Sequence, residues 1–120
     1  MTTDIIYHMC RREEWVEAEK GGAYAGSSQD HADGFIHFSG GAQIVESAAK
    51  HRAGQSGLVL LSVDPDKLGT ALKWESSRGG ALFPHLYGDL SPTAVVRVDE
   101  LALGADGLHV FPPDVGRADG

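Results

Sequence analysis

The sequence is poor in cysteine and in basic residues, and both shortages exclude whole classes of protein. Of its 120 residues only Cys10 is a cysteine, so no disulfide can form within the chain. Lysine and arginine number 10 against 17 aspartate and glutamate residues, which gives a formal net charge of −7. Such a chain repels a phosphate backbone, and no cluster of Lys and Arg is present that would build a local basic groove. We therefore expect no bulk nucleic-acid binding.

Long apolar runs are missing as well. No stretch approaches the ~18 apolar residues that a membrane helix requires, and the first ten residues, with an acid at Asp4, do not resemble a signal peptide. We therefore expect no membrane partner and a cytoplasmic location. The hydrophobic content of 42% and the charged content of 22% are typical of a globular protein. The length predicts one domain over 1–120, with an irregular Pro- and Gly-rich tail over about 104–120.

Short strands dominate the predicted secondary structure. The strongest is 58–64 (LVLLSVD), in which five of seven residues are apolar, as expected of a strand in the centre of a sheet. An extended segment or a short strand is predicted at 82–88. A central strand is not expected there, because proline is disfavoured inside one and this segment contains Pro84. Further strands are predicted at 4–10, 34–39, 71–75 and 93–101.

Two short helices are predicted near the N-terminus. The first spans 11–22 and ends in Lys-Gly-Gly, a helix stop. The second ends at Gly54 and has Ser39 as its N-cap. Residues 23–33 between them predict a polar loop. Helices and strands that are not interleaved in regular alternation indicate an α+β fold.

Polar side chains on the predicted strands are the candidate functional residues. Strands hold reactive groups more rigidly than loops do, and histidine titrates near neutral pH. Three of these side chains are histidines in apolar segments, where a histidine is costly unless it is hydrogen-bonded. The candidates on strands are His8, His37, Ser39, Glu75 and His85.

Each candidate also has a structural explanation. A single histidine in a strand is more often a hydrogen-bonded core or edge residue than a catalyst. Ser39 fits a helix N-cap, and Glu75 fits the solvated end of a strand. Trp74 and Tyr87 fit the core as well as a platform on which a ligand ring stacks.

Motifs with known chemistry are absent. The sequence contains no Gly-rich phosphate loop, no nucleophile elbow, and neither an H-E-x-x-H nor a Cys-pair zinc signature. A metal bound by the strand histidines and Glu75 would require their strands to be neighbours, and we predict no metal cofactor. Cys10 is predicted to be a small buried hydrophobe. The histidines predicted at the surface are His31, His51 and His109.

Four segments resemble the uncharacterised bacterial family called domain of unknown function 952. They are IYHMC, DGFIHFS, LKWE and FPHLYG, and the resemblance extends from about Ile5 to Leu101. The family is remotely similar to the ADP-ribosyltransferase superfamily, which includes the RNA 2′-phosphotransferases. The resemblance implies the fold of that superfamily, a small split β-sheet that grips NAD between two half-sheets.

The resemblance also implies roles for individual residues. His8 matches a polar residue on the first strand that hydrogen-bonds a ribose, and His37 and Ser39 fall where the second motif contacts the nicotinamide-side ribose. Glu75 or His85 would take the third position, which acts on the acceptor. The ring platform would be Trp74 or Tyr87. The match is incomplete: His37 stands where an aromatic–Ser–Thr–Ser pattern is expected, and the strand motifs lack the arginines of RNA 2′-phosphotransferases.

The sequence is compatible with three candidate functions. The first is an NAD-cleft protein of ADP-ribosyltransferase-like type, with NAD as candidate substrate, an unknown acceptor, and Glu75, His85 and His37 as catalytic residues. The second is a non-catalytic module that binds a nucleotide or a small anion. The third is a His/Glu metal-dependent hydrolase. All three assume that His8, His37 and His85 meet in space, and the oligomeric state is open.

Overall fold

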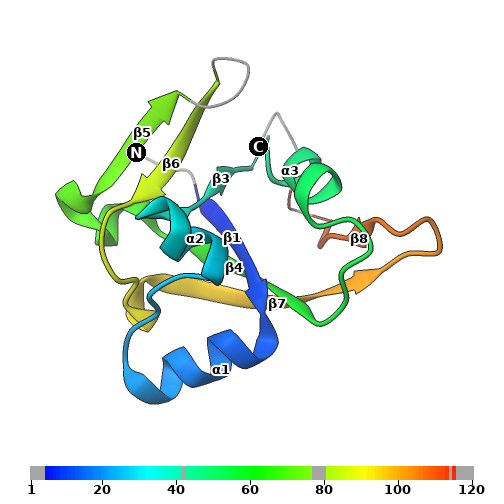
Figure 1. Cartoon of the computed structure of the whole chain (residues 1–120), viewed down its shortest axis with the longest axis horizontal. Helices are drawn as coiled ribbons and strands as arrows, with labels where there is room; N and C mark the ends of the chain where they lie inside the picture. Colours follow the sequence, from blue (N-terminus) through cyan, green and yellow to red (C-terminus); the bar gives the residue numbers. More distant parts are fainter. Residues whose placement is uncertain (1–4, 42, 77–80, 114, 116–120) are drawn as a thin grey trace.

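Two antiparallel sheets make up the fold (Figure 1). The computed structural model of the chain describes residues 5–41, 43–76, 81–113 and 115. The larger sheet has the strand order β3-β1-β4-β7-β8, and the smaller has the order β2-β6-β5. The predicted α+β class with a split sheet is confirmed. The strands are β1 (Ile6–Arg11), β2 (Ile36–His37), β3 (Ser39–Gly40), β4 (Leu58–Val63), β5 (Leu72–Ser76), β6 (Leu82–Leu86), β7 (Val95–Leu103) and β8 (His109–Val110).

The centre of the larger sheet is β4, as its apolar sequence predicts. All six of its residues are buried. Alternate side chains of β1 and β4 enter two separate cores, because successive residues of a strand point to opposite faces. Leu61 packs with α1 (Arg12–Gly21) and the smaller sheet, whereas Leu60 packs with α3 (Ile44–His51). Each such buried side chain contributes roughly 2 kcal/mol.

The segment predicted as one strand at 34–39 divides between the two sheets. Ile36 and His37 form β2 and pair with Leu86 and His85 of β6. After Phe38 the chain enters the larger sheet, where Ser39 pairs with a residue of β1. This crossing places His37 directly opposite His85, although 48 positions separate them in the sequence.

Pro84 lies in the central strand of the smaller sheet, against expectation. It is tolerated there because β2 ends beside it. The Pro84 carbonyl still accepts a hydrogen bond from the Phe38 N–H at 2.9 Å. In an antiparallel ladder the N–H and C=O of one residue face the same neighbour, so the proline forgoes one hydrogen bond at the end of a short strand.

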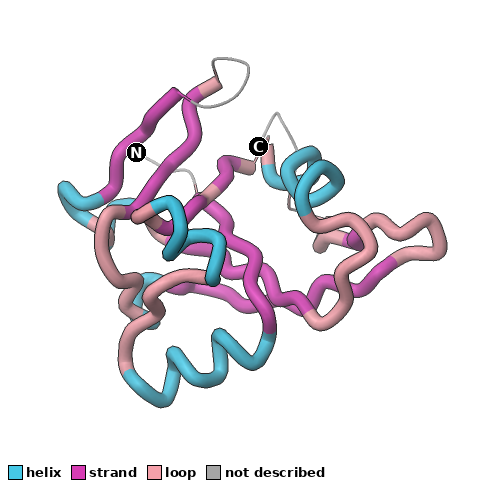
Figure 2. Tube along the Cα trace, viewed as in Figure 1, coloured by secondary structure: helices cyan, strands magenta, loops and turns pink. Residues whose placement is uncertain are grey.

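The helices correct two predictions. Residues predicted as a polar loop include α2 (Ser28–Asp33), whose capping box joins Ser27 and Asp30 (Figure 2). Ser39 is not a helix N-cap. Its backbone pairs in β3, its Oγ donates to Ser47 Oγ at 3.2 Å, and α3 begins at Ile44 after Gln43.

The predicted tail contains a strand. β8 pairs with β7, and its His109 is buried rather than on the surface, with Nε2 donating to the Gln55 carbonyl at 2.7 Å. Cys10 is fully buried as predicted, and burial raises the pKa of its thiol to about 12. In the described ranges, no helix has the length and apolar character needed to cross a membrane.

Candidate functional site

The candidate site is a group of ring-bearing side chains on the outer face of the smaller sheet. This is the face opposite Ile36 and Leu86, whose side chains lie in the core shared with the larger sheet. His37 and His85 are register partners, so their rings point to the same face, with centroids 5.5 Å apart. Phe35 precedes β2 and lies against both rings. Its ring stacks on His85 at 4.2 Å and 28°, and lies 4.6 Å from His37. Tyr87 completes the group at 5.2 Å from Phe35.

Glu75 ties two of these rings together. Its Oε1 accepts hydrogen bonds from His85 Nδ1 at 2.8 Å and from Tyr87 Oη at 2.7 Å. The hydrogen bond from His85, followed by that from Tyr87, lowers the pKa of Glu75. The hydrogen bond to Glu75 raises the pKa of Tyr87. The site therefore presents an ionised carboxylate that is 38% exposed and fixed in position.

The same contact sets the tautomer of His85. An ionised carboxylate only accepts hydrogen bonds, so the proton of the neutral ring sits on Nδ1. No hydrogen bond to Nε2 is found within the described part of the chain. Its lone pair is then available as a base, which is the arrangement a carboxylate–histidine pair provides in general base catalysis.

His37 lies between two carboxylates, which favour the protonated form of its ring. Its Nδ1 donates to Asp30 Oδ1 at 2.5 Å, and its Nε2 lies 3.0 Å from Asp33 Oδ2. The hydrogen bond to Asp30 is the main cause that raises the pKa of His37, against the opposing effect of burial. Because both ring nitrogens are occupied, His37 supplies charge and shape to the site rather than a free acid or base.

Asp30 organises the edge of the smaller sheet. Its side chain is 3% exposed and accepts hydrogen bonds from the Ser27 N–H, the Ser27 hydroxyl and the His37 N–H at 2.8, 3.1 and 3.1 Å. Burial raises the pKa of Asp30, but the hydrogen bond from the His37 ring and the charges nearby outweigh it and lower the pKa to about 2. Asp30 also caps the backbone of β2 on the side where no strand of the described residues pairs with it.

His8 lies behind the site, on β1 of the larger sheet. Its Nδ1 donates to the His37 carbonyl at 2.6 Å, and its Nε2 accepts from the Tyr24 hydroxyl at 2.7 Å. Burial lowers the pKa of His8, so the ring is neutral. Both nitrogens are satisfied inside the protein, and the ring touches Phe38 and Tyr24 rather than solvent. The structure thus joins His8 to His37 through a backbone carbonyl and not ring to ring.

Two predicted ligand-binding residues lie elsewhere. Ser39 is buried in β3 of the larger sheet. Trp74 is 49% exposed, but it follows Lys73 and precedes Glu75 in β5, so its side chain points to the opposite face from Glu75. The predicted residues that the structure brings together on the outer face are His37, Glu75, His85 and Tyr87.

Three residues of the site were missed from the sequence. Phe35 alternates with His37 and could have been found from that spacing. Asp30 stands three residues after Ser27, the spacing of a capping box, which was the available signal for α2. Asp33 has no sequence signal, because its role depends on where α2 packs.

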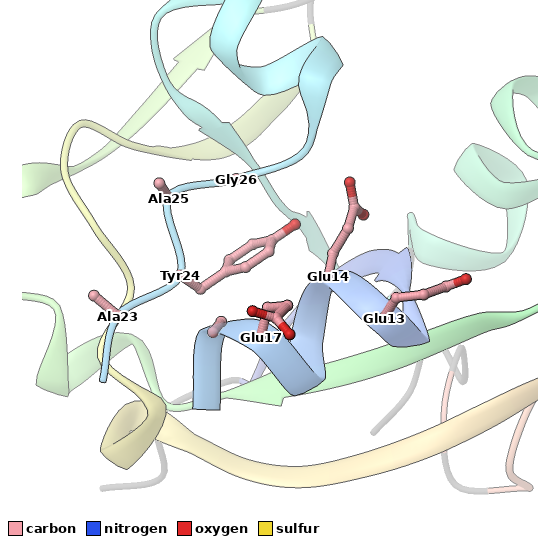
Figure 3. A pocket seen from close by; sticks show the side chains of 8 residues that line it. Glu13, Glu14, Glu17, Ala23, Tyr24, Ala25 and Gly26 are labelled. Carbon is pink, nitrogen blue, oxygen red and sulfur yellow. The ribbon is translucent and has the colours of Figure 1, made fainter. Parts of the chain in front are cut away.

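Two open depressions are lined by residues of α1 and α2 and of the segments that follow them. One of about 330 Å³ lies beside Phe35 and Asp30 and extends to Asp89. The other, of about 450 Å³, lies between α1 and residues 23–26, with Glu13, Glu14 and Glu17 on its helical side (Figure 3). Among the described residues no three His, Cys, Asp or Glu side chains form a group that could bind a metal ion.

Comparisons with known proteins give a family and a fold. The family model described as "Protein of unknown function (DUF952)" matches residues 9–98. The crystal structure of protein CC0527 from Caulobacter crescentus is 51% identical, over 88% of this chain and 93% of that chain, with a TM-score of 0.85. The solution NMR structure of CC0527 is 52% identical, over 87% and 90% of the two chains, with a TM-score of 0.78. No curated protein is significantly similar to the chain.

Proposed function

We propose that this chain, which belongs to the family of proteins of unknown function DUF952, binds NAD and transfers ADP-ribose from it to an acceptor nucleophile. The proposed site is the outer face of the smaller sheet. Between the sheets, Ile36 and Leu86 belong to the same buried hydrophobic core as Ile6 and Leu61. That part of the inter-sheet space is filled by side chains, so the ligand is placed on the outer face instead of in a cleft between half-sheets.

The observation that carries the proposal is the exposed carboxylate of Glu75 beside aromatic rings. Nicotinamide in NAD is a planar ring with a positive charge. Phe35 and Tyr87 offer faces on which such a ring stacks, and the nearby carboxylate complements its charge. The two hydrogen bonds that hold Glu75 fix this charge before the ligand arrives, which is the condition for effective electrostatic stabilisation.

The reaction assigns a different task to each residue. The bond between the ribose anomeric carbon and the nicotinamide nitrogen breaks, and its electron pair leaves with neutral nicotinamide. The ribose acquires oxocarbenium character, which the carboxylate of Glu75 stabilises. The acceptor then forms a bond to the same carbon, and its proton passes to Nε2 of His85. His37 and Asp30 keep the face rigid but take no proton.

Nicotinamide release from NAD by the purified protein tests the proposal. Glu75→Gln keeps the shape of the side chain and removes its charge. We expect release to fall roughly 10²–10³-fold, and NAD affinity measured by calorimetry to fall by a smaller factor than the rate. Glu46→Gln is the control, because Glu46 is an exposed carboxylate on α3 paired with Lys50.

The outcomes separate the candidate functions. Equal nicotinamide release by wild type and Glu75→Gln would contradict the role of Glu75. Binding of NAD without release by wild type would favour the second candidate, a non-catalytic nucleotide-binding module. Absence of NAD binding at millimolar concentration would overturn the proposed transferase and would leave the second candidate only with another nucleotide or a small anion as its ligand.

A further inference from the structure

β7 exposes one side of its backbone. On its other side it pairs with β4 from Leu101 back to Val95. β8 covers the exposed side only at Ala102 and Leu103. No other strand of the described chain lies along that side. An edge of this kind presents N–H and C=O groups to another strand.

The exposed part of this edge carries apolar side chains, whereas edge strands in soluble proteins usually carry residues that prevent pairing with another chain. Val96 and Val98 are 53% and 41% exposed. Valine has a high preference for paired strands, and natural edges are commonly blunted by lysine, proline or a covering loop. Residues 95–101 contain neither lysine nor proline.

Two residues of opposite charge flank Val98 on this edge. Arg97 precedes it and Asp99 follows it, and the two side chains share one face, where Arg97 Nε donates to Asp99 Oδ2 at 2.6 Å. In an antiparallel pair of two identical strands centred on Val98, each Arg97 stands opposite the partner's Asp99. Opposite charges at directly opposed positions stabilise a strand pair, whereas like charges destabilise it.

We propose that two copies of the chain associate through β7 as an antiparallel, two-fold symmetric pair centred on Val98. The two five-stranded sheets then become continuous across the dimer axis. The same patch serves both copies, as a two-fold interface requires. Edge pairing over this short length buries less surface than the ~1,200 Å² of a standard interface, so the dimer is expected to be weak, with a Kd in the micromolar range. The proposed catalytic face lies on the other sheet, so this inference does not depend on the proposed function.

Sedimentation velocity over about 1 μM to 1 mM protein tests the proposal. Wild type is expected to shift from monomer to dimer across this range. Arg97→Asp and Asp99→Arg each place like charges opposite one another and are expected to weaken the dimer roughly tenfold or more. The double variant Arg97→Asp/Asp99→Arg restores opposite charges and is expected to restore the dimer. Lys50→Asp, an exposed charge reversal on α3, is the control.

Circular dichroism of each variant shows whether it is folded. A double variant that dimerises again shows that the single variants lost the dimer through charge repulsion and not through misfolding. A wild type that stays monomeric throughout would overturn the proposal. Single variants that dimerise as wild type does, or a double variant that stays monomeric while folded, would overturn it as well.

Discussion

The two faces of the smaller sheet differ in chemistry more than in burial. Leu86 on the inner face and His85 on the outer face are 2% and 7% exposed, although they are neighbours in β6. The inner face buries Leu86 in the apolar core, where packing needs no partner groups. The outer face buries His85 beneath Phe35 and supplies Glu75 as its hydrogen-bond partner. Polar side chains are thus confined to the face where carboxylates can reach them.

The pKa values of the histidines on the two sides are shifted in opposite directions. His8 has a lowered pKa, first because burial penalises its charged form, and His37 has a raised pKa, first because of the hydrogen bond to Asp30. Asp30 lies near both rings, 3.6 Å from His8 Nε2 and hydrogen-bonded to His37. The difference follows from geometry, because the His37 carbonyl and the Tyr24 hydroxyl occupy the two nitrogens of a neutral His8.

Removing the inner histidine is expected to have the largest effect. His8→Leu leaves the His37 carbonyl and the Tyr24 hydroxyl without their partner in the interior. The free energy of unfolding, measured by urea denaturation at pH 7, should fall by about 3 kcal/mol. His51→Leu, at an exposed position near the end of α3, should change it by no more than about 0.5 kcal/mol. Equal losses in both variants would show that the buried hydrogen bonds are not the cause.

Neutralising Asp30 is expected to have the next largest effect, and the effect depends on pH. The pKa of Asp30 falls from its ordinary value of 3.8 to about 2 on folding, so its contribution is present above about pH 4 and is lost as the pH falls through about 2. This difference corresponds to about 2 kcal/mol. Unfolding free energies of wild type and Asp30→Asn between pH 5 and 2 should therefore converge toward acid. Parallel curves would contradict the role of the Asp30 charge.

Truncating a ring on each face is expected to have the smallest effect and compares the faces directly. Phe35→Ala removes the ring that stacks on His85 and should weaken NAD binding roughly tenfold. Trp74→Ala removes a larger and more exposed ring from the opposite face and should leave the affinity unchanged. Calorimetric titration with NAD measures both. A larger loss in Trp74→Ala would place the ligand on the inner face.

Sequence reasoning located most elements of the fold, and its errors have local causes. The run of apolar residues in β4 and the glycine stop of α1 were enough, because both signals act over neighbouring positions. The segment 34–39 reads as one strand, since nothing in its side chains marks the change of sheet at Phe38. That change is decided by which strands lie on either side, which depends on distant parts of the chain.

The candidate site was predicted in its residue types but not in its connections. His37, Glu75, His85 and Tyr87 were selected because they lie in strand-like segments, and the structure brings them together. Trp74 was predicted with them but lies on the opposite face, because successive side chains of β5 point to opposite faces. Alternation could have shown this once β5 was taken as a regular strand.

By itself, the sequence determined the class of fold, the central strand, the burial of Cys10 and the set of polar groups available to a site, because these follow from composition and from patterns of two to four residues. The tertiary structure alone decided that His37 faces His85 while His8 remains behind them. It also decided that Asp30 lies close to the rings of both His8 and His37. The reason is that strand register and the packing of α2 set distances between residues far apart in the chain, and no local pattern encodes those distances.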